Sequence, residues 1–236
     1  MKPEPHIVVL TGAGISAESG LLTFRDAGGL WEGYDINEVA SIEGWRKDPE
    51  KVLRFYNMRR RQAFDVEPNN AHIKVAELQK DFRVTVITQN VDDLHERAGS
   101  ENVIHLHGEL TKACSEVDRS LSIEIGDKPI NWGDKAPDGA QLRPDIVWFG
   151  EMVPMIEVAA GIMSQADILL VIGTSLAVYP AAGLIHAAPD FAVKVLIDPN
   201  IPEFQSFDGW SIIQDKATTG IEVFIRNLKE GHYSGK

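Results

Sequence analysis

The sequence predicts an α/β protein built on a doubly wound parallel sheet of the Rossmann type, with a small inserted module. Short runs of β-branched and aliphatic residues recur along the chain, and helical patterns lie between them. Polar or glycine residues follow the C-terminal ends of these runs, which is where doubly wound sheets bind ligands. The 236 residues, 44% of them hydrophobic, can bury a real core.

Local patterns place the individual elements. Apolar runs predict strands over residues 6–10, 83–88, 103–108, 167–173 and 193–198, and the α/β pattern resumes after the inserted module at 145–150. Asp48 and Pro49 predict the start of a helix that runs to Arg61, because Asp is a favoured N-cap and Pro suits the first turn. Asn70 is expected to cap a second helix that reaches Phe82. A last helix is expected over residues 219–228.

Composition divides the chain into three parts. Residues 1–31, 83–110 and 145–236 are assigned to the Rossmann-like domain, and residues 32–82 to a helical insertion. Residues 111–144 form the small module, because charges and prolines dominate there and the apolar content falls.

The overall composition excludes several classes of protein. The 23 basic and 35 acidic residues give a net charge of −12, which argues against nucleic-acid binding. Cys114 is the single cysteine, so an internal disulfide is impossible and a reducing compartment is expected. No apolar run is long enough to span a bilayer, and the first residues lack the apolar core of a signal peptide. We therefore expect a cytoplasmic protein that does not bind membranes. Separately, we expect it to be a monomer.

The first ligand-binding signal follows the strand at residues 6–10. The glycine pattern continues through Gly12, Ala13, Gly14, Ser16 and Ala17. Glycines of this spacing let the backbone turn tightly and approach a pyrophosphate at a helix N-terminus. By itself this pattern predicts only a dinucleotide-binding turn.

The next stretch departs from the dehydrogenase pattern, which places an acidic residue about twenty positions further on to hold the ribose. Here Phe24, Arg25 and Trp31 flank paired glycines. Mobility from glycine and cover from aromatic rings predict a loop over the ligand. A surface loop pinned to the core by Trp31 is the alternative.

Three further strand ends carry groups suited to a nucleotide. They are Gln89, Asn90 and Asp92; Gly173, Thr174 and Ser175; and Asp198, Pro199 and Asn200. Side-chain amides match the carboxamide of nicotinamide, and a carboxylate such as that of Asp198 accepts hydrogen bonds from ribose hydroxyls. Because these residue types also form turns, a structural role is the alternative for each cluster taken singly.

His107 is the candidate general base. An imidazole takes up a proton near neutral pH, and the following Gly108 leaves space for a substrate. A purely structural role for His107 is the alternative, and the presence of His105 two residues earlier on the same strand face strengthens that alternative.

Several motifs in order resemble the sirtuins, the NAD-dependent protein lysine deacylases, over about residues 5 to 228. The motifs are Gly12 to Ser16, Thr23 to Arg25, Thr88 to Asp92, His107 with Gly108, Val147 to Glu151, and Gly173 to Ser175. The resemblance implies NAD as cofactor and acyl-lysine proteins as substrates. It also implies a reaction in two steps: the acyl oxygen of the modified lysine displaces nicotinamide from NAD, and the acyl group then migrates to ADP-ribose.

The same resemblance implies roles for individual residues. His107 would act as general base on a ribose hydroxyl, while Asn90 and Asp92 would orient the nicotinamide and its ribose. The remaining cofactor contacts would be Gly12, Ala13, Gly14, Ser16, Ala17, Phe24, Arg25, Trp31, Gln89, Val91, Gly173, Thr174, Ser175, Asp198, Pro199, Asn200 and Ala217. The substrate peptide would add as a strand along Val147, Phe149, Gly150, Glu151, Val178 and Tyr179.

Tyr56 and Arg59 indicate the class of acyl group. Three residues apart on a helix, they share a face, and an arginine fork beside a phenol binds a carboxylate. This pair is similar to that of sirtuins that remove succinyl and malonyl groups, and acetyl-lysine remains a further candidate. From local pattern alone, Arg59 belongs to a solvated run of three arginines.

One departure from the sirtuin pattern concerns the inserted module. Sirtuins usually hold a structural zinc there with two cysteine pairs, whereas this chain has Cys114 alone. Asp118, Asp134 and Asp138 are hard oxygen donors that replace thiolates poorly. We therefore predict no metal. Packing of the module is expected around Ile130, Trp132 and Leu142.

Two other functions use the same cofactor residues. An ADP-ribosyltransferase or NAD hydrolase would cleave NAD without deacylation, and a silent NAD-sensing module would only bind it. Tyr56, Arg59 and His107 favour the deacylase, because acyl transfer needs an acyl pocket and a base.

Overall fold

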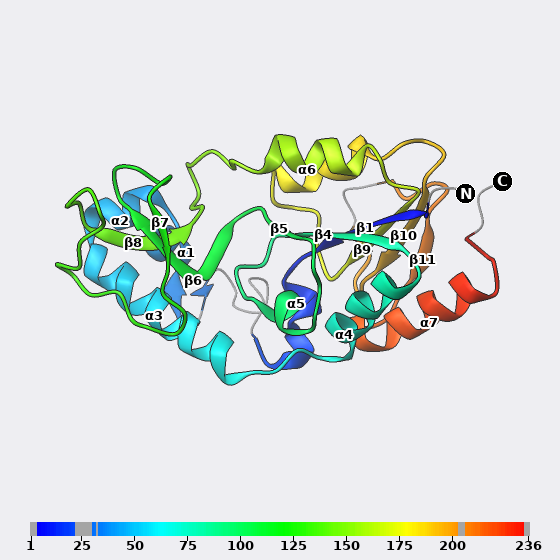
Figure 1. Ribbon diagram of the computed structural model, residues 1–236, viewed down its shortest axis with the longest axis horizontal. Helices are drawn as coiled ribbons and strands as arrows, with labels where there is room; N and C mark the ends of the chain where they lie inside the picture. The colour runs from blue at the N-terminus through cyan, green and yellow to red at the C-terminus, as the bar shows by residue number, and fades with distance from the viewer. Residues whose placement is uncertain (1–3, 22–29, 32, 203–205, 234–236) are drawn as a thin grey trace.

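The computed structural model describes residues 4–21, 30–31, 33–202 and 206–233. In these residues a six-stranded parallel sheet has the order β11-β10-β9-β1-β4-β5, which confirms the predicted doubly wound, Rossmann-like architecture (Figure 1). The strands are β1 (His6–Thr11), β4 (Arg83–Thr88), β5 (Val103–His105), β9 (Ile168–Ile172), β10 (Val193–Ile197) and β11 (Ser211–Ile213). β1 lies between β4 and β9, so the chain reverses its winding direction there.

Helices cover both faces of this sheet, which explains why β1 and β9 are apolar without alternation. α4 (Asn70–Glu77) and α7 (Ala217–Lys229) pack on one face through a core that includes Val75 and Phe224. α6 (Ile156–Met163) and the 3₁₀ helix η4 (Ala181–Ala187) pack on the other through Met163 and Leu184 (Figure 1). α5 (Leu94–Arg97) follows the end of β4.

A second group of elements lies beside the sheet and packs around its own apolar core (Figure 1). It contains α1 (Ile36–Val39), α2 (Ile42–Lys47) and α3 (Pro49–Asp65), together with the antiparallel strands β6 (Gly108–Ser115), β7 (Ser122–Glu124) and β8 (Leu142–Ile146). A short hairpin joins β2 (Leu30–Trp31) to β3 (Tyr34–Asp35). Ile130 and Leu142 are buried in this core as expected, but Trp132 is 56% exposed and does not contribute.

The structure corrects several boundaries. The predicted strand at 103–108 ends at His105, and Gly108 begins β6 of the other sheet. The stretch after residue 144 completes β8 and does not enter the parallel sheet. Asn69, and not Asn70, caps α4, since its Oδ1 accepts a hydrogen bond from Ala71 N at 2.9 Å. α4 ends at Glu77, and the 3₁₀ helix η3 (Leu78–Lys80) continues the chain. Asp48 caps α3 as expected.

The turn after β1 is held against the turn after β9 by direct backbone contact. Gly14 N donates to Gly173 O at 2.8 Å, and a Cβ on Gly14 would lie 2.6 Å from Gly173 Cα. Gly173 also has a φ of +62°, which favours glycine. The expected helix N-terminus is absent here; two 3₁₀ turns, η1 (Ala13–Ile15) and η2 (Ala17–Ser19), follow Gly12 instead.

Two glycine substitutions should therefore have opposite effects on stability. Gly173→Ala places a Cβ 2.4 Å from Ile15 N in a left-handed backbone, so we expect a loss of about 2 kcal/mol or more. Gly161→Ala, at an exposed position of α6 with nothing within 4 Å of the added Cβ, should gain about 0.5–1 kcal/mol from helix propensity. Urea unfolding gives the free energy of unfolding of both variants. If Gly173→Ala changed it no more than Gly161→Ala does, the contact between the two turns would not matter for stability.

Candidate active site

A cleft of about 660 Å³ opens at the C-terminal ends of the parallel strands and continues to α3 and β8. It brings together almost every site residue predicted from the sequence. On the cofactor side these are Gly12, Ala13, Gly14, Ser16, Ala17, Gln89, Asn90, Val91, Asp92, His107, Gly173, Thr174, Ser175, Asp198, Pro199, Asn200 and Ala217. On the substrate side they are Tyr56, Arg59, Val147, Phe149, Gly150, Glu151, Val178 and Tyr179. Phe24 and Arg25 lie outside the described residues, and only the backbone of Trp31 is described, in β2.

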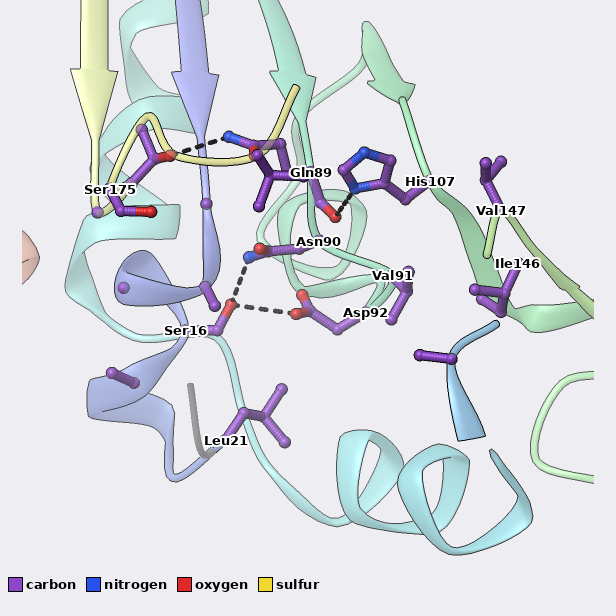
Figure 2. Close-up of a pocket in the computed structure, with 18 of the residues that line it drawn as sticks. Ser16, Leu21, Gln89, Asn90, Val91, Asp92, His107, Ile146, Val147 and Ser175 are labelled. Atoms are coloured by element: carbon purple, nitrogen blue, oxygen red, sulfur yellow. Dashed lines mark hydrogen bonds between the residues drawn. The ribbon is translucent and has the colours of Figure 1, made fainter. Parts of the chain in front are cut away.

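Ser16 is the centre of a hydrogen-bond cluster in this cleft (Figure 2). Its hydroxyl accepts from Asn90 Nδ2 at 3.1 Å and donates to Asp92 Oδ2 at 3.2 Å. All three side chains are buried, so each polar atom needs a partner, and the cluster fixes their orientation. Burial also raises the pKa of Asp92. The turn after β1 and the loop after β4 therefore present one rigid polar surface to the cleft.

The loop after β4 is anchored through the ends of two strands. Thr11 Oγ1 donates to Thr88 Oγ1 at 2.8 Å, and Thr88 Oγ1 in turn accepts from Asn90 N at 3.0 Å. Gln89 Nε2 donates to Thr174 Oγ1 at 3.0 Å, which ties the loop to the strand end after β9. Three strand ends that are remote in sequence are thus joined by hydroxyl and amide groups.

His107 has the geometry of a general base. Its Nδ1 lies 3.0 Å from the carbonyl oxygen of Gln89, and a carbonyl only accepts hydrogen bonds, so Nδ1 carries the proton (Figure 2). Nε2 is then left with its lone pair. Burial lowers the pKa of His107, so the ring is neutral at neutral pH and able to take up a proton.

His105 is in the opposite state. Its Nδ1 lies 3.0 Å from Asn90 O and its Nε2 lies 2.8 Å from Glu96 Oε1. Both partners are acceptors, so the ring satisfies both only as an imidazolium. Although burial acts to lower it, the hydrogen bond and charge of Glu96 raise the pKa of His105. His105 thus holds the loop after β4 through the carbonyl group of Asn90, and it is not a second base.

Two buried histidines beneath the cluster were not singled out from the sequence. His72 Nδ1 accepts from Asn69 N, so Nε2 is the protonated nitrogen that faces Ser16 Oγ at 3.4 Å. His95 Nε2 lies 3.1 Å from Thr11 Oγ1, and the two rings meet edge to face at 5.0 Å. Burial lowers the pKa of His72 to about 4, so it supports Ser16 as a neutral donor. Only contacts between distant segments reveal this role.

The far ends of the cleft have different chemistry. At one end the buried carboxylate of Asp198 accepts from Asn200 N at 2.8 Å, beside Ala217 at the start of α7. At the other end Tyr56 and Arg59 of α3 are both almost fully buried and both line the cleft. Ala40, which was not predicted as a site residue, lines the cleft as well, and so does Trp148, for which only a backbone role within the Val147–Glu151 segment was expected.

Comparison with known proteins identifies the family. The sequence profile described as "Sir2 family" matches residues 12–180. The chain belongs to the Sir2 family. This confirms the sirtuin resemblance drawn from the separate motifs.

Two curated relatives of this Sir2-family chain carry the name NAD-dependent protein deacylase. One, from Helicobacter pylori, is 60% identical and the match covers 95% of this chain and 96% of the relative. The other, from Bacteroides thetaiotaomicron, is 54% identical with coverage of 92% and 95%.

Solved Sir2 structures share the fold. A Sir2 homolog–NAD complex is 39% identical with a TM-score of 0.86, covering 97% of this chain and 91% of that one. A Sir2–p53 peptide–NAD⁺ complex is 29% identical with a TM-score of 0.75, covering 97% and 94%. These findings support NAD as the cofactor of this Sir2-family protein.

The module where sirtuins usually hold zinc lacks a matching donor set. Burial raises the pKa of the Cys114 thiol to about 12, and its Sγ faces the carbonyl oxygen of Pro144 at 4.0 Å. Asp138 is used by Ser115, whose buried hydroxyl donates to its Oδ2 at 2.7 Å. Within the described residues no three His, Cys, Asp or Glu side chains are grouped to bind a metal ion. The side chains present do not fit a zinc site.

Ser115 joins two segments of the inserted module. Its hydroxyl donates to Asp138, and it accepts hydrogen bonds from Val117 N and Asp118 N, each at 3.2 Å. We expect Ser115→Ala to cost about 1–3 kcal/mol, because the buried hydroxyl that joins Asp138 to two backbone amides is lost. Ser164→Ala, which removes an exposed hydroxyl bond to Gly161 O, is the control and should change little. Thermal unfolding after exhaustive chelation should match that of untreated protein. Stoichiometric zinc in the purified protein would contradict a metal-free module.

None of the helices in the described residues has both the length and the apolar character needed to cross a bilayer.

Proposed function

We propose that this protein is an NAD-dependent protein lysine deacylase that removes acidic acyl groups, succinyl and malonyl, and also accepts acetyl-lysine. With one molecule of water as co-reactant, NAD and the acyl-lysine would give nicotinamide, O-acyl-ADP-ribose and free lysine. The observation that carries the proposal is a single cleft lined by the Ser16 cluster, by His107 and by Tyr56 with Arg59. The names of the curated relatives support the same activity.

The polar groups of the cleft fit NAD. Asn90 and Asp92 would hold the nicotinamide and its ribose, because their side chains are already fixed by Ser16. The buried carboxylate of Asp198 would accept hydrogen bonds from the adenine ribose. When bound, NAD supplies a glycosidic bond whose cleavage releases nicotinamide and makes the ribose carbon electrophilic.

His107 would move the proton in the acyl-transfer step. Gln89 O fixes the tautomer, so Nε2 accepts the proton of a ribose hydroxyl. By removing that proton, His107 would make the hydroxyl oxygen nucleophilic toward the acyl carbon. The lowered pKa of His107 ensures that the base is free of its proton at neutral pH.

The substrate backbone would lie along the segment after β8, but not through all of its amides. Val147 N donates to His107 O and Phe149 N donates to Ala40 O, each at 2.9 Å. A peptide strand would therefore pair with other groups of the segment, such as the Gly150 amide, and with the segment at Val178 and Tyr179. This pairing reads the main chain and tolerates varied sequences.

Tyr56 and Arg59 would select the acyl group. Both lie at the end of the cleft formed by α3, where little water reaches them. A guanidinium in such a site binds a carboxylate through charge-assisted hydrogen bonds, which are stronger than those of neutral pairs. An acetyl group offers no charge to this pair and would gain nothing from it.

Product analysis with a His107 variant tests the reaction. Wild-type protein with NAD and a succinyl-lysine peptide should release nicotinamide and O-succinyl-ADP-ribose in equal amounts. His107→Ala should abolish turnover while leaving NAD binding largely intact, because the base is lost but the Ser16 cluster remains. The acidic limb of wild-type kcat/KM should lie below pH 6.5, since burial lowers the pKa of His107 from that value.

The alternative outcomes are distinct. Nicotinamide without an acylated product would identify an NAD hydrolase, and binding without either product would identify a sensor. Full turnover by His107→Ala would remove its role as base.

Arg59→Met should separate acidic from neutral acyl groups. We expect kcat/KM for desuccinylation to fall by about 1.5–3 kcal/mol relative to deacetylation, the range for a hydrogen bond to a charged group. Arg61→Met, two residues along α3 with an exposed side chain, is the matched control and should change neither reaction. Equal losses for both acyl groups would contradict carboxylate recognition.

A further inference from the structure

We propose that Trp148 is a positioning residue for acyl specificity: its indole N–H holds the Tyr56 hydroxyl so that the phenolic proton is offered to an acidic acyl group. This inference rests on the proposed preference for acidic acyl groups. Trp148 lies within the predicted peptide-binding segment, and the proposal assigns to its side chain a separate task at the acyl end of the cleft.

The hydrogen bond between the two side chains fixes the direction of the phenol. Trp148 Nε1 donates to Tyr56 Oη at 3.0 Å. An indole N–H is only a donor, so the phenolic oxygen accepts here and its own proton is left for another partner. Within the described residues no acceptor for that proton is found, although Tyr56 lines the cleft. A carboxylate in the cleft would provide one.

Burial keeps Tyr56 in the donor state. The side chain is 1% exposed, and burial raises the pKa of its hydroxyl despite the opposing hydrogen bond from Trp148 and the charges of Arg143 and Arg59. The phenol therefore stays protonated across the working pH range. A neutral donor next to the Arg59 cation forms a site that matches a carboxylate and not a second cation.

Trp148 is itself held by a buried ion pair. The Arg143 guanidinium stacks 3.5 Å from the centre of the indole ring. Arg143 also forms a bidentate pair with Glu151, at 2.7 and 2.9 Å, and Glu151 accepts from Trp148 N at 2.8 Å. The Glu151 carboxylate thus fixes the backbone of Trp148, and the Arg143 guanidinium fixes its ring. The indole N–H has one direction, toward Tyr56.

Trp148→Phe tests this role, because phenylalanine keeps an aromatic ring and lacks the N–H. We expect kcat/KM for desuccinylation to fall about ten-fold, while that for deacetylation changes less than about two-fold. Trp45→Phe is the matched control. Its ring lies 5.5 Å from that of Trp148 in the same core, so packing is altered while the bond to Tyr56 stays. It should lower both activities equally or not at all.

A double-mutant cycle distinguishes positioning from general damage. Because Trp148 acts through Tyr56, the double variant Tyr56→Phe with Trp148→Phe should be no worse in desuccinylation than Tyr56→Phe alone. If the losses of desuccinylation kcat/KM in the two single variants multiplied in the double variant, the proposal would be overturned. A selective loss of desuccinylation in Tyr56→Phe but not in Trp148→Phe would overturn it as well. If neither Tyr56→Phe nor Arg59→Met changes acyl selectivity, the preference for acidic acyl groups itself is wrong.

A measurement on wild-type protein covers the case in which Trp148→Phe does not fold. The Nε1–H resonance of Trp148, assigned in ¹⁵N-labelled protein, should shift when a succinyl-lysine peptide binds, because the phenol then donates to the carboxylate. The matching acetyl-lysine peptide should leave it nearly unchanged. Equal shifts with both peptides would refute the coupling.

Discussion

The site depends on the close approach of two backbone turns, those after β1 and β9, at the point where the strand order of the sheet reverses. A Cβ on Gly14 would clash with the backbone of Gly173, and a Cβ on Gly173 would clash with the backbone of Gly14 and Ile15, so only glycine lets the turn after β1 lie on the turn after β9. This contact sets where Ser16 lies relative to Thr174, and through them it positions Asn90, Asp92 and Gln89. The strands alone bring their ends to one edge, but the glycines bring them within hydrogen-bond range.

Two histidines near the same loop show how local partners set chemistry. His107 and His105 each contact a backbone carbonyl of the loop after β4, that of Gln89 and that of Asn90 respectively. The other nitrogen of His105 meets the Glu96 carboxylate, which makes that ring a cation, whereas His107 faces the cleft and stays neutral. Spacing in the sequence could not separate a base from an anchor. The partner of the second nitrogen does.

Sequence patterns predicted what is determined locally. The buried parallel strands, the Asp48 cap and the polar strand ends follow from neighbours in the chain, and so does their convergence on one cleft once a parallel sheet is assumed. The support of Ser16 by His72 was missed because a histidine in the first turn of a helix signals only capping. The break between β5 and β6 was missed because the apolar run continues across it, although the residues enter different sheets.

The ion pair between Arg143 and Glu151 links the inserted module to the end of the cleft at Tyr56 and Arg59. A buried pair contributes little net stability, since desolvation offsets most of the attraction, but it fixes geometry because leaving either charge alone is costly. Arg143 lies on β8, whose partner strand β6 carries Ser115, and Glu151 follows Trp148 in the cleft wall. Arg119 adds a second link, since it contacts both Asp145 and Glu151. In this chain the same charged residues close the module and orient Trp148, so loosening the module must also loosen the hold on Tyr56.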